Sequence, residues 1–345
     1  MIRPLLPLVA ALAVTAVAVA QTRTPSPAPA LAPGEIVAAA PKADWVTIPA
    51  SDLLVMDLAP PAQGPGQASA KAKPRRVVIQ LMPPPFAQGW IGNIRKLAAA
   101  HWWDGLSINR VQDNYVVQWG DADGEDKAKA RALPNGLSVI PEKCYELSQV
   151  ETGCFSDGIE GAIEGLGATA EDSKSPSEFR NGDPYAAWTD HVFGWPIAMK
   201  QESGTNEWFM WPVHCYAMVG VGRDLSPNTG SGAELYAVIG HAPRHLDRNI
   251  ALVGRVIEGI EHLSSLPRGT GALGFYETPE ERTNILSIRL GSEVASLPAY
   301  EYLSTESETF ARYADARANR RDPFFIKPAG GADICNIPVP VRKVK

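Results

Sequence analysis

Short apolar runs separated by turn-forming residues dominate the middle of this sequence, and long amphipathic stretches are few. Gly, Pro, Asn and Asp, which favour turns, bound most of these runs. A run of this kind buries its apolar side chains only by pairing with others in a sheet. Eight of them predict strands, at residues 53–56, 77–82, 106–111, 115–119, 215–221, 235–239, 251–256 and 284–290. The chain is therefore expected to be mainly β, a barrel or a sandwich with helical caps.

Three segments indicate helices. Apolar residues recur at helical spacing over residues 90–98, and residues 258–266 suit a short helix. Thr305-Glu306-Ser307-Glu308 has the form of a capping box, which predicts a helix that runs to about Arg321. The later segment Ile337–Val341 contains two prolines and is expected to be extended.

The first twenty residues have the pattern of a secretory signal peptide. Met1-Ile2-Arg3 carries a positive charge, Leu5–Ala20 is largely apolar, and Ala18-Val19-Ala20 is a small-x-small cleavage pattern. A membrane anchor is the alternative, but the run is short for a span and no strong basic stop follows it. We expect residues 1–20 to be removed and residues 21–43 to form an Ala/Pro-rich linker. The protein is then periplasmic or secreted, with no membrane span after removal of the signal.

The four cysteines are interpreted in the light of export. An even number of cysteines in an oxidising compartment suggests disulfides, and four allow three connectivities. Turn-forming residues between Cys144 and Cys154 favour that pair, which leaves Cys215 with Cys335. Four buried free thiols are the alternative. The sequence contains no CxxC, so neither a structural zinc site nor a redox motif is indicated.

Residues 122–213 differ from the strand-rich segments on either side. Their first part is polar and Gly-rich, and their second part is rich in aromatic residues. They are expected to form a large insertion with a small apolar cluster of its own. The resulting division is a domain over 44–300 that contains this insertion, followed by a C-terminal helix and extended tail over 301–345.

Several function classes receive no support. A net charge of −6 at pH 7 argues against a nucleic-acid binder that relies on bulk positive charge. Gly220-Val221-Gly222 lacks the third glycine of a dinucleotide site, and Gly230-Ser231-Gly232 lacks the spacing of a nucleophile elbow. His241 and His245 are separated by a proline, and no metal-binding spacing of histidines is present. A Ser-His-Asp hydrolase is defined by spatial arrangement, so it stays as a weaker hypothesis.

Residues Trp103 to Asp121 form the most informative stretch, and they resemble the cyclophilin signature. Arg110, the aromatic residue five positions later, Gln118 and the closing Gly120-Asp121 all stand at that family's spacing. Further segments resemble cyclophilin segments in the same order along the chain: Val77–Leu81, Asn93-Ile94-Arg95, Glu234-Leu235-Tyr236, His245-Leu246-Asp247 and Val253–Val256. The resemblance covers roughly residues 50–121 and 214–292.

The resemblance implies a closed eight-stranded antiparallel β-barrel capped by two helices, and peptidyl-prolyl cis-trans isomerase activity. Rotation about an X–Pro bond must break amide resonance, which gives a barrier of about 20 kcal/mol. No bond is made or cut, so the reaction requires no cofactor or metal. The implied partners are proline-containing segments of unfolded or folding proteins.

The resemblance also assigns site residues. Arg110 matches the catalytic arginine, and Gln118 matches the glutamine that contacts the peptide and orients that arginine. A planar, always-charged guanidinium suits a donor that favours the twisted amide. The positions that match substrate-binding residues are Tyr115, Val116, Tyr236 and Leu246 in the pocket wall, His245 at the rim, Glu234 beside them, and Val219 and Gly220 in the strand that pairs with the peptide backbone.

Five positions depart from the family pattern. Asn109 and Ile250 replace histidines, Val116 replaces a methionine, Glu234 stands where glutamine is usual, and Tyr236 adds a hydroxyl to a wall that phenylalanine normally makes. These departures affect substrate fit and rate more than fold. A catalytically weak or inactive cyclophilin-like module that binds peptides or acts as a chaperone is therefore the main alternative to an enzyme.

Overall fold

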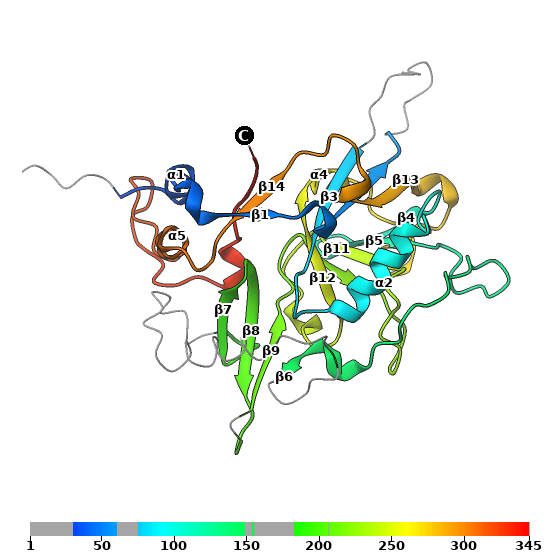
Figure 1. Cartoon of the computed structure of the whole chain (residues 1–345), viewed down its shortest axis with the longest axis horizontal. Coiled ribbons are helices and arrows are strands. Elements are labelled where there is room, and N and C mark those ends of the chain that lie inside the picture. Colours follow the sequence, from blue (N-terminus) through cyan, green and yellow to red (C-terminus); the bar gives the residue numbers. More distant parts are fainter. Residues whose placement is uncertain (1–29, 61–74, 149–153, 155–182, 206, 345) are drawn as a thin grey trace, which may run out of the picture.

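The computed structural model describes residues 30–60, 75–148, 154, 183–205 and 207–344 (Figure 1). The predicted signal peptide, the linker up to residue 29 and most of the Pro/Gly-rich loop between residues 60 and 74 lie outside these ranges. Among the described residues, no helix is long and apolar enough to cross a membrane.

Eight antiparallel strands close into a barrel, as expected. All eight strands predicted from the apolar runs are present. In spatial order they are β10 (Met218–Val221), β11 (Leu235–Val238), β5 (Val116–Gly120), β4 (Ser107–Val111), β13 (Thr283–Leu290), β2 (Leu53–Leu58), β3 (Arg75–Leu81) and β12 (Leu252–Glu258).

Alternation along the strands divides the barrel residues between two faces. Val117, Trp119 and Ala237 are fully buried in the main core, whereas their chain neighbours point outward. Helix α2 (Gln88–Ala99) lays Trp90, Ile94 and other apolar residues on this core, which confirms the predicted helix. The short helix α4 (Glu261–Ser264) buries Leu263 in the same core.

The insertion contributes a second sheet. Its strands lie in the order β6 (Leu147–Ser148), β9 (Trp208–Pro212), β8 (Trp195–Gln201) and β7 (Trp188–Val192). Trp195, Ile197 and Trp211 belong to the same apolar cluster as the barrel core. The expectation of a separate cluster is therefore wrong. So small a sheet has no second layer of its own to cover its aromatic face. It buries that face against the barrel instead.

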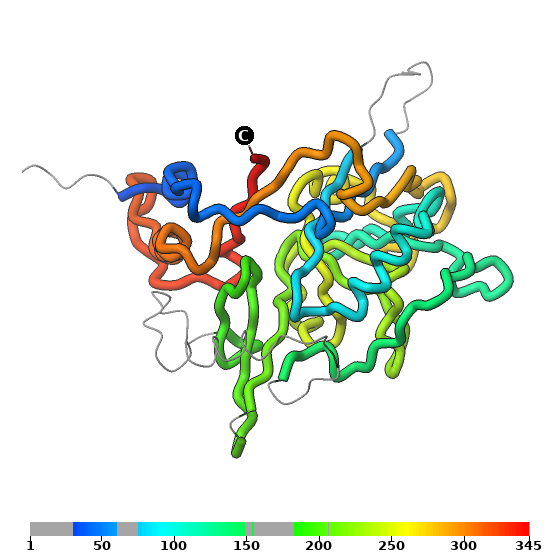
Figure 2. The backbone as a smooth tube through the Cα atoms, in the orientation of Figure 1, coloured from blue at the N-terminus to red at the C-terminus, as the bar shows by residue number. Residues whose placement is uncertain are grey.

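The two ends of the described chain form a third unit. Strand β14 (Tyr300–Leu303) pairs with β1 (Trp45–Ile48) on one side and β15 (Val341–Lys343) on the other. Helix α1 (Pro33–Ala38) packs on α5 (Glu308–Ala318), and Figure 2 shows the blue N-terminal and orange-red C-terminal segments side by side.

Three predictions at these ends need correction. The expected linker over 21–43 contains α1, whose Ile36 is buried against α5, so the fold begins before Trp45. The expected domain boundary at residue 300 falls inside β14. Ser307, rather than Thr305, caps α5, because its side chain accepts the Phe310 N–H at 3.0 Å.

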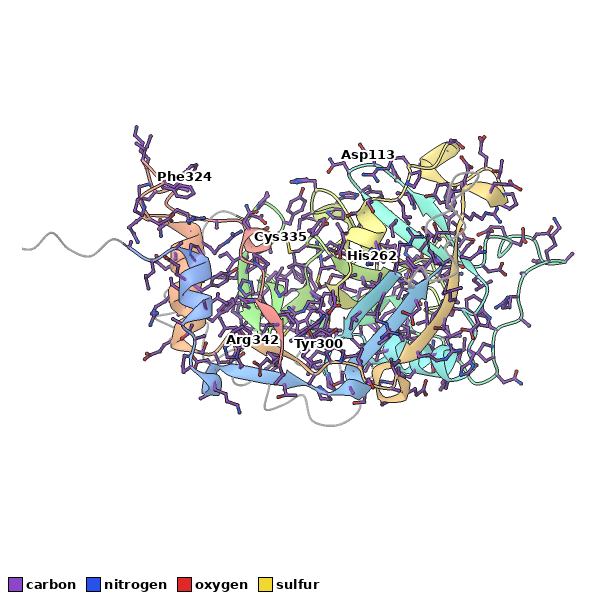
Figure 3. All side chains as sticks on the ribbon, turned by 90° about the horizontal axis from the view of Figure 1, so that it is seen from above. Asp113, His262, Tyr300, Phe324, Cys335 and Arg342 are labelled. Carbon is purple, nitrogen blue, oxygen red and sulfur yellow. A yellow bond between two sulfur atoms is a disulfide. The ribbon has the colours of Figure 1, made fainter. Side chains whose placement is uncertain are left out.

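Both favoured disulfides are present, Cys144–Cys154 and Cys215–Cys335. The second joins the C-terminal unit to the segment that precedes β10. Arg342 and Tyr300, both labelled in Figure 3, lie on the sheet of the same unit. The Arg342 guanidinium carbon lies 3.6 Å from the centre of the Trp45 ring, and Arg342 pairs with Glu301 at 2.6 Å. The Tyr300 hydroxyl donates to Glu258 of β12 at 2.6 Å, which links this sheet to the barrel.

Candidate active site

The β4–β5 hairpin places Arg110 directly opposite Gln118. The register continues across the barrel, because Gln118 pairs with Tyr236 of β11 and Tyr236 pairs with Gly220 of β10. Residues paired in this way in an antiparallel sheet share one face. Arg110, Gln118, Tyr236 and Gly220 therefore form one row on the outer face of four adjacent strands.

Arg110 is held on three sides. Its Nε donates to the Leu273 carbonyl at 2.8 Å, Nη1 to Gln118 Oε1 at 3.3 Å, and Nη2 to Gln112 Oε1. Its guanidinium carbon lies 5.2 Å from the centre of the Phe275 ring and 5.7 Å from that of Tyr115. Among the described residues, these contacts use three of the five guanidinium N–H groups, which leaves two for a ligand.

Partial burial lowers the pKa of Arg110, but an arginine side chain stays protonated in proteins. The group is thus a fixed cation between two aromatic rings. It is therefore not a freely solvated arginine on a surface strand.

An apolar wall lies beside Arg110 on the same outer face. It consists of the buried residues Val116, Tyr236 and Val238, with Tyr115 and Ile250 packed against them. The rings of Tyr115 and His245 are stacked with their centres 6.3 Å apart. Of the predicted wall residues, Tyr115, Val116 and Tyr236 come together, whereas the half-buried Leu246 is not part of this cluster.

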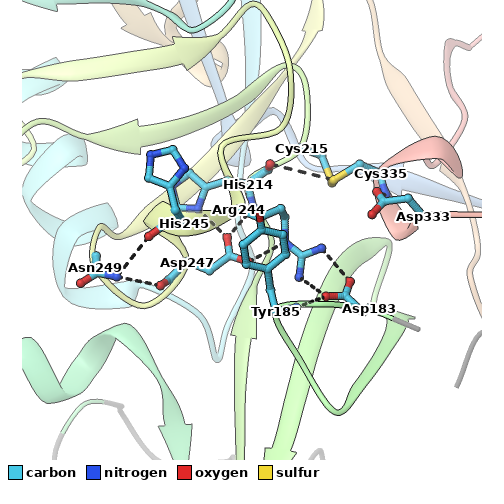
Figure 4. Close-up of polar contacts among 10 residues, drawn as sticks. All are labelled: Asp183, Tyr185, His214, Cys215, Arg244, His245, Asp247, Asn249, Asp333 and Cys335. Carbon is cyan, nitrogen blue, oxygen red and sulfur yellow. Dashed lines mark hydrogen bonds and ion pairs between the residues drawn. A yellow bond between two sulfur atoms is a disulfide. The ribbon is translucent and has the colours of Figure 1, made fainter. Parts of the chain in front are cut away.

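The hydroxyl of Tyr236 is directed away from the wall into the protein. It donates at 2.8 Å to Nε2 of His214. The Nδ1 of His214 in turn donates to Asp247 at 2.8 Å (Figure 4). His214 and Asp247 are buried, and burial lowers the pKa of the imidazole, which keeps it neutral. A Cβ atom at Gly220 would overlap the Tyr236 ring and hydroxyl, so only glycine fits at this end of the row.

Glu234 lies behind Gln118. Its carboxylate accepts the Asp121 N–H at 2.6 Å, and the Asn109 amide is 3.5 Å away. Burial nevertheless raises the pKa of Glu234 to about 7. The Asn109 Oδ1 is buried and has no hydrogen-bond partner in the part of the chain that the structure describes. With the Asn109 amide rotated, a neutral Glu234 would donate its proton to this oxygen.

Val219 and Gly220 lie in β10, which pairs with β11 on one edge and with β12 on the other, with a register shift between these two residues. Their pairing with a peptide backbone stays a prediction. The Val219 side chain faces the main core. The chain leaves the barrel at Gly222, and this residue and Arg223 line a cavity of about 440 Å³ beside Gln118 and Glu234.

Several residues at the site were not identified from the sequence. Phe275 and Leu273 reach Arg110 from a distant loop, and His214 and Arg244 stand behind Tyr236. Asp247 could have been singled out, because it belongs to the His245-Leu246-Asp247 segment. Among the described residues, no cluster of His, Cys, Asp and Glu could hold a metal ion.

A solved cyclophilin structure shares this fold. The structure is similar to a crystal structure of cyclophilin AquaCyp293 from Hirschia baltica, with a TM-score of 0.59 and 19% identity over 87% of this chain and 93% of that one. At that identity the similarity establishes the fold. A Cryptosporidium parvum cyclophilin-type peptidyl-prolyl cis-trans isomerase, crystallised in the presence of the dipeptide Ala-Pro, gives a TM-score of 0.34 and 10% identity over 62% and 92% of the two chains.

The comparison with curated proteins finds no match to the sequence. The family model described as cyclophilin type peptidyl-prolyl cis-trans isomerase/CLD matches residues 90–290, which is more than half of the chain and includes the whole row from Arg110 to Gly220. The chain therefore belongs to the cyclophilin-type peptidyl-prolyl cis-trans isomerase family.

Proposed function

We propose that this chain catalyses cis–trans isomerisation of X–Pro bonds in exported proteins, and that it assists their folding in the periplasm or outside the cell. The observation that carries the proposal is the placement of Arg110, a half-buried cation with two free N–H groups, beside the apolar wall. The wall accepts the proline ring, and Gln118 contacts the peptide.

The chemistry asks little more of the site. During rotation the amide nitrogen regains its lone pair, and a fixed N–H donor stabilises that state more than the planar ground state. The guanidinium is already oriented by Leu273, Gln112 and Gln118, so it does not have to reorganise. Uncatalysed exchange takes tens of seconds, which is slow enough to limit the folding of a protein.

The place of action rests on two features. Two disulfides suit an oxidising compartment, and the apolar run over residues 5–20 suits export. The signal peptide, its removal and the linker remain predictions from the sequence.

A protease-coupled assay on a chromogenic Ala-Pro peptide tests the activity. The wild-type chain should accelerate isomerisation, and Arg110→Ala should lower kcat/KM by about 100-fold or more, the usual loss for one transition-state donor. Arg312→Ala, at an exposed position on α5, is the matched control and should leave the rate unchanged. A wild-type rate equal to that of buffer would contradict the proposal. It would favour the alternative of a catalytically inactive module that binds peptides.

The folding role needs a separate experiment. A secreted protein whose refolding is limited by proline isomerisation should lose its slow phase when this chain is added, whereas Arg110→Ala should not have that effect. An enzyme active on the peptide that leaves the slow refolding phase unchanged would contradict the folding role and not the activity.

A further inference from the structure

A buried polar network runs from the apolar wall to the insertion. After Tyr236, His214 and Asp247, it continues to Arg244, whose Nε donates to Asp247 Oδ2 at 2.6 Å (Figure 4). Arg244 also donates from Nη1 to Asp183 Oδ2 at 2.7 Å and from Nη2 to Asp183 Oδ1 at 3.2 Å. Side-chain exposure is 3% for Arg244, 4% for Asp247 and 7% for Asp183, so water does not screen these contacts.

The end of this polar network that lies farthest from the apolar wall belongs to the insertion. Asp183 and Tyr185 stand in the described part of it just before β7, and the Arg244 guanidinium lies 5.1 Å from the centre of the Tyr185 ring. Arg244 itself stands in the turn before β12. The insertion is therefore in direct contact with the residues behind the wall.

The donor and the acceptor of each hydrogen bond in this polar network are fixed. Asp247 Oδ1 accepts both the His214 backbone N–H at 3.0 Å and the His214 Nδ1–H at 2.8 Å. The imidazole therefore presents a bare Nε2 to Tyr236, and the tyrosine hydroxyl must donate to it. This bond determines which way the Tyr236 ring faces in the wall.

Asp183 is the second carboxylate partner of Arg244, so one guanidinium bridges two carboxylates. The contacts with His214 first, and with Arg244 second, hold the pKa of Asp247 below its ordinary value despite its burial. Without the second carboxylate, Arg244 loses its bidentate partner and is free to move away from Asp247. A displaced Asp247 no longer orients His214, which leaves the buried Tyr236 hydroxyl without its acceptor.

We propose that Asp183 and Tyr185 of the insertion are positioning residues for the apolar wall, acting through Arg244, Asp247 and His214 on the ring of Tyr236. The inference rests on the proposed isomerase function and gives the insertion a part in it. It explains why a tyrosine can serve at a wall position: its hydroxyl is held away from the proline ring.

A double-mutant cycle tests the inference. Asp183→Asn should lower kcat/KM on the Ala-Pro peptide by about tenfold, mainly through a higher KM. A tenfold effect lies within the range of interaction energies between residues of one hydrogen-bonded network. In the Tyr236→Phe background the same substitution should change kcat/KM less than about twofold, because no hydroxyl remains to be oriented. Glu146→Gln, an acid-to-amide change in the insertion that touches Lys200 and Arg248 instead, is the matched control.

Nitrogen-15 NMR of the His214 ring supplies a readout without substrate. It should show the Nδ1–H tautomer with an accepting Nε2, and a loss of that hydrogen bond in Asp183→Asn. An active wild-type enzyme in which Asp183→Asn has the same effect in both backgrounds, or leaves the His214 signals unchanged, overturns the inference and leaves the proposed function intact. An inactive wild-type chain overturns the proposed function instead.

Discussion

Replacement of Glu234 by glutamine should change the way in which stability depends on pH. The folded protein raises the pKa of this carboxyl from 4.5 to about 7 because the group is buried. Between those pH values the folded state binds a proton that the unfolded chain has already lost. The cost of ionising Glu234 is therefore absent below pH 4.5, grows as the pH rises, and is complete above pH 7.

The magnitude follows from the shift. A difference of about 2.5 pKa units corresponds to about 3 kcal/mol at 1.36 kcal/mol per unit. Glutamine keeps the carbonyl that accepts the Asp121 N–H and never ionises. The gain in the free energy of unfolding from Glu234→Gln should therefore be about 3 kcal/mol larger at pH 8 than at pH 4.5.

Urea unfolding of both proteins at several pH values between 4.5 and 8 measures this difference. Other titrating groups contribute equally to both proteins, so they cancel when one curve is subtracted from the other. A difference that does not vary with pH, or that shrinks as the pH rises, would refute the burial of a neutral carboxyl behind Gln118.

Three further predictions concern stability, and the last of them also concerns KM. Removal of Cys215–Cys335, which closes a loop of 120 residues, should cost about 5 kcal/mol in urea unfolding by the loop-entropy relation, against about 3 kcal/mol for the 10-residue loop of Cys144–Cys154; equal losses would contradict the expectation. Burial lowers the pKa of His191 from 6.5 to about 4, so the stability that this residue contributes is present above pH 6.5 and is lost as the pH falls through 4. His191→Gln should therefore make the acid limb of the curve of stability against pH shallower. An unchanged limb would contradict the lowered pKa of His191. Gly220→Ala should lower Tm and raise KM because its Cβ displaces the Tyr236 ring, and a fully stable, fully active variant would show that the ring has room to move.

The sequence predicts the parts of this protein that depend on local pattern. The β4–β5 hairpin brings Arg110 and Gln118 together within eight residues, and the cyclophilin resemblance of this short stretch assigned both to the site. The eight barrel strands are predicted for the same reason, because alternation and turn residues act over a few positions.

Contacts between distant segments could not be predicted in this way. His214 meets Asp247 across 33 residues and Arg244 meets Asp183 across 61. Trp45 pairs with Leu303 only because both ends of the chain return to one sheet. Gly220 has no side chain to give a pattern, and whether its strand lies at an edge or inside a closed barrel is a property of the whole topology.

Magnetisation-exchange NMR on an Ala-Pro peptide tests the central claim most directly, because it observes the two isomers in the presence of the protein without a coupling protease. The wild-type chain should produce exchange peaks between the cis and trans forms, because it makes exchange far faster than the uncatalysed reaction, which takes tens of seconds. Arg110→Ala should abolish these peaks while the peptide still shifts the signals of Val116 and Tyr236. Exchange peaks that are absent with the wild-type chain, or equally strong with Arg110→Ala, would contradict the assignment of this row as an isomerase site.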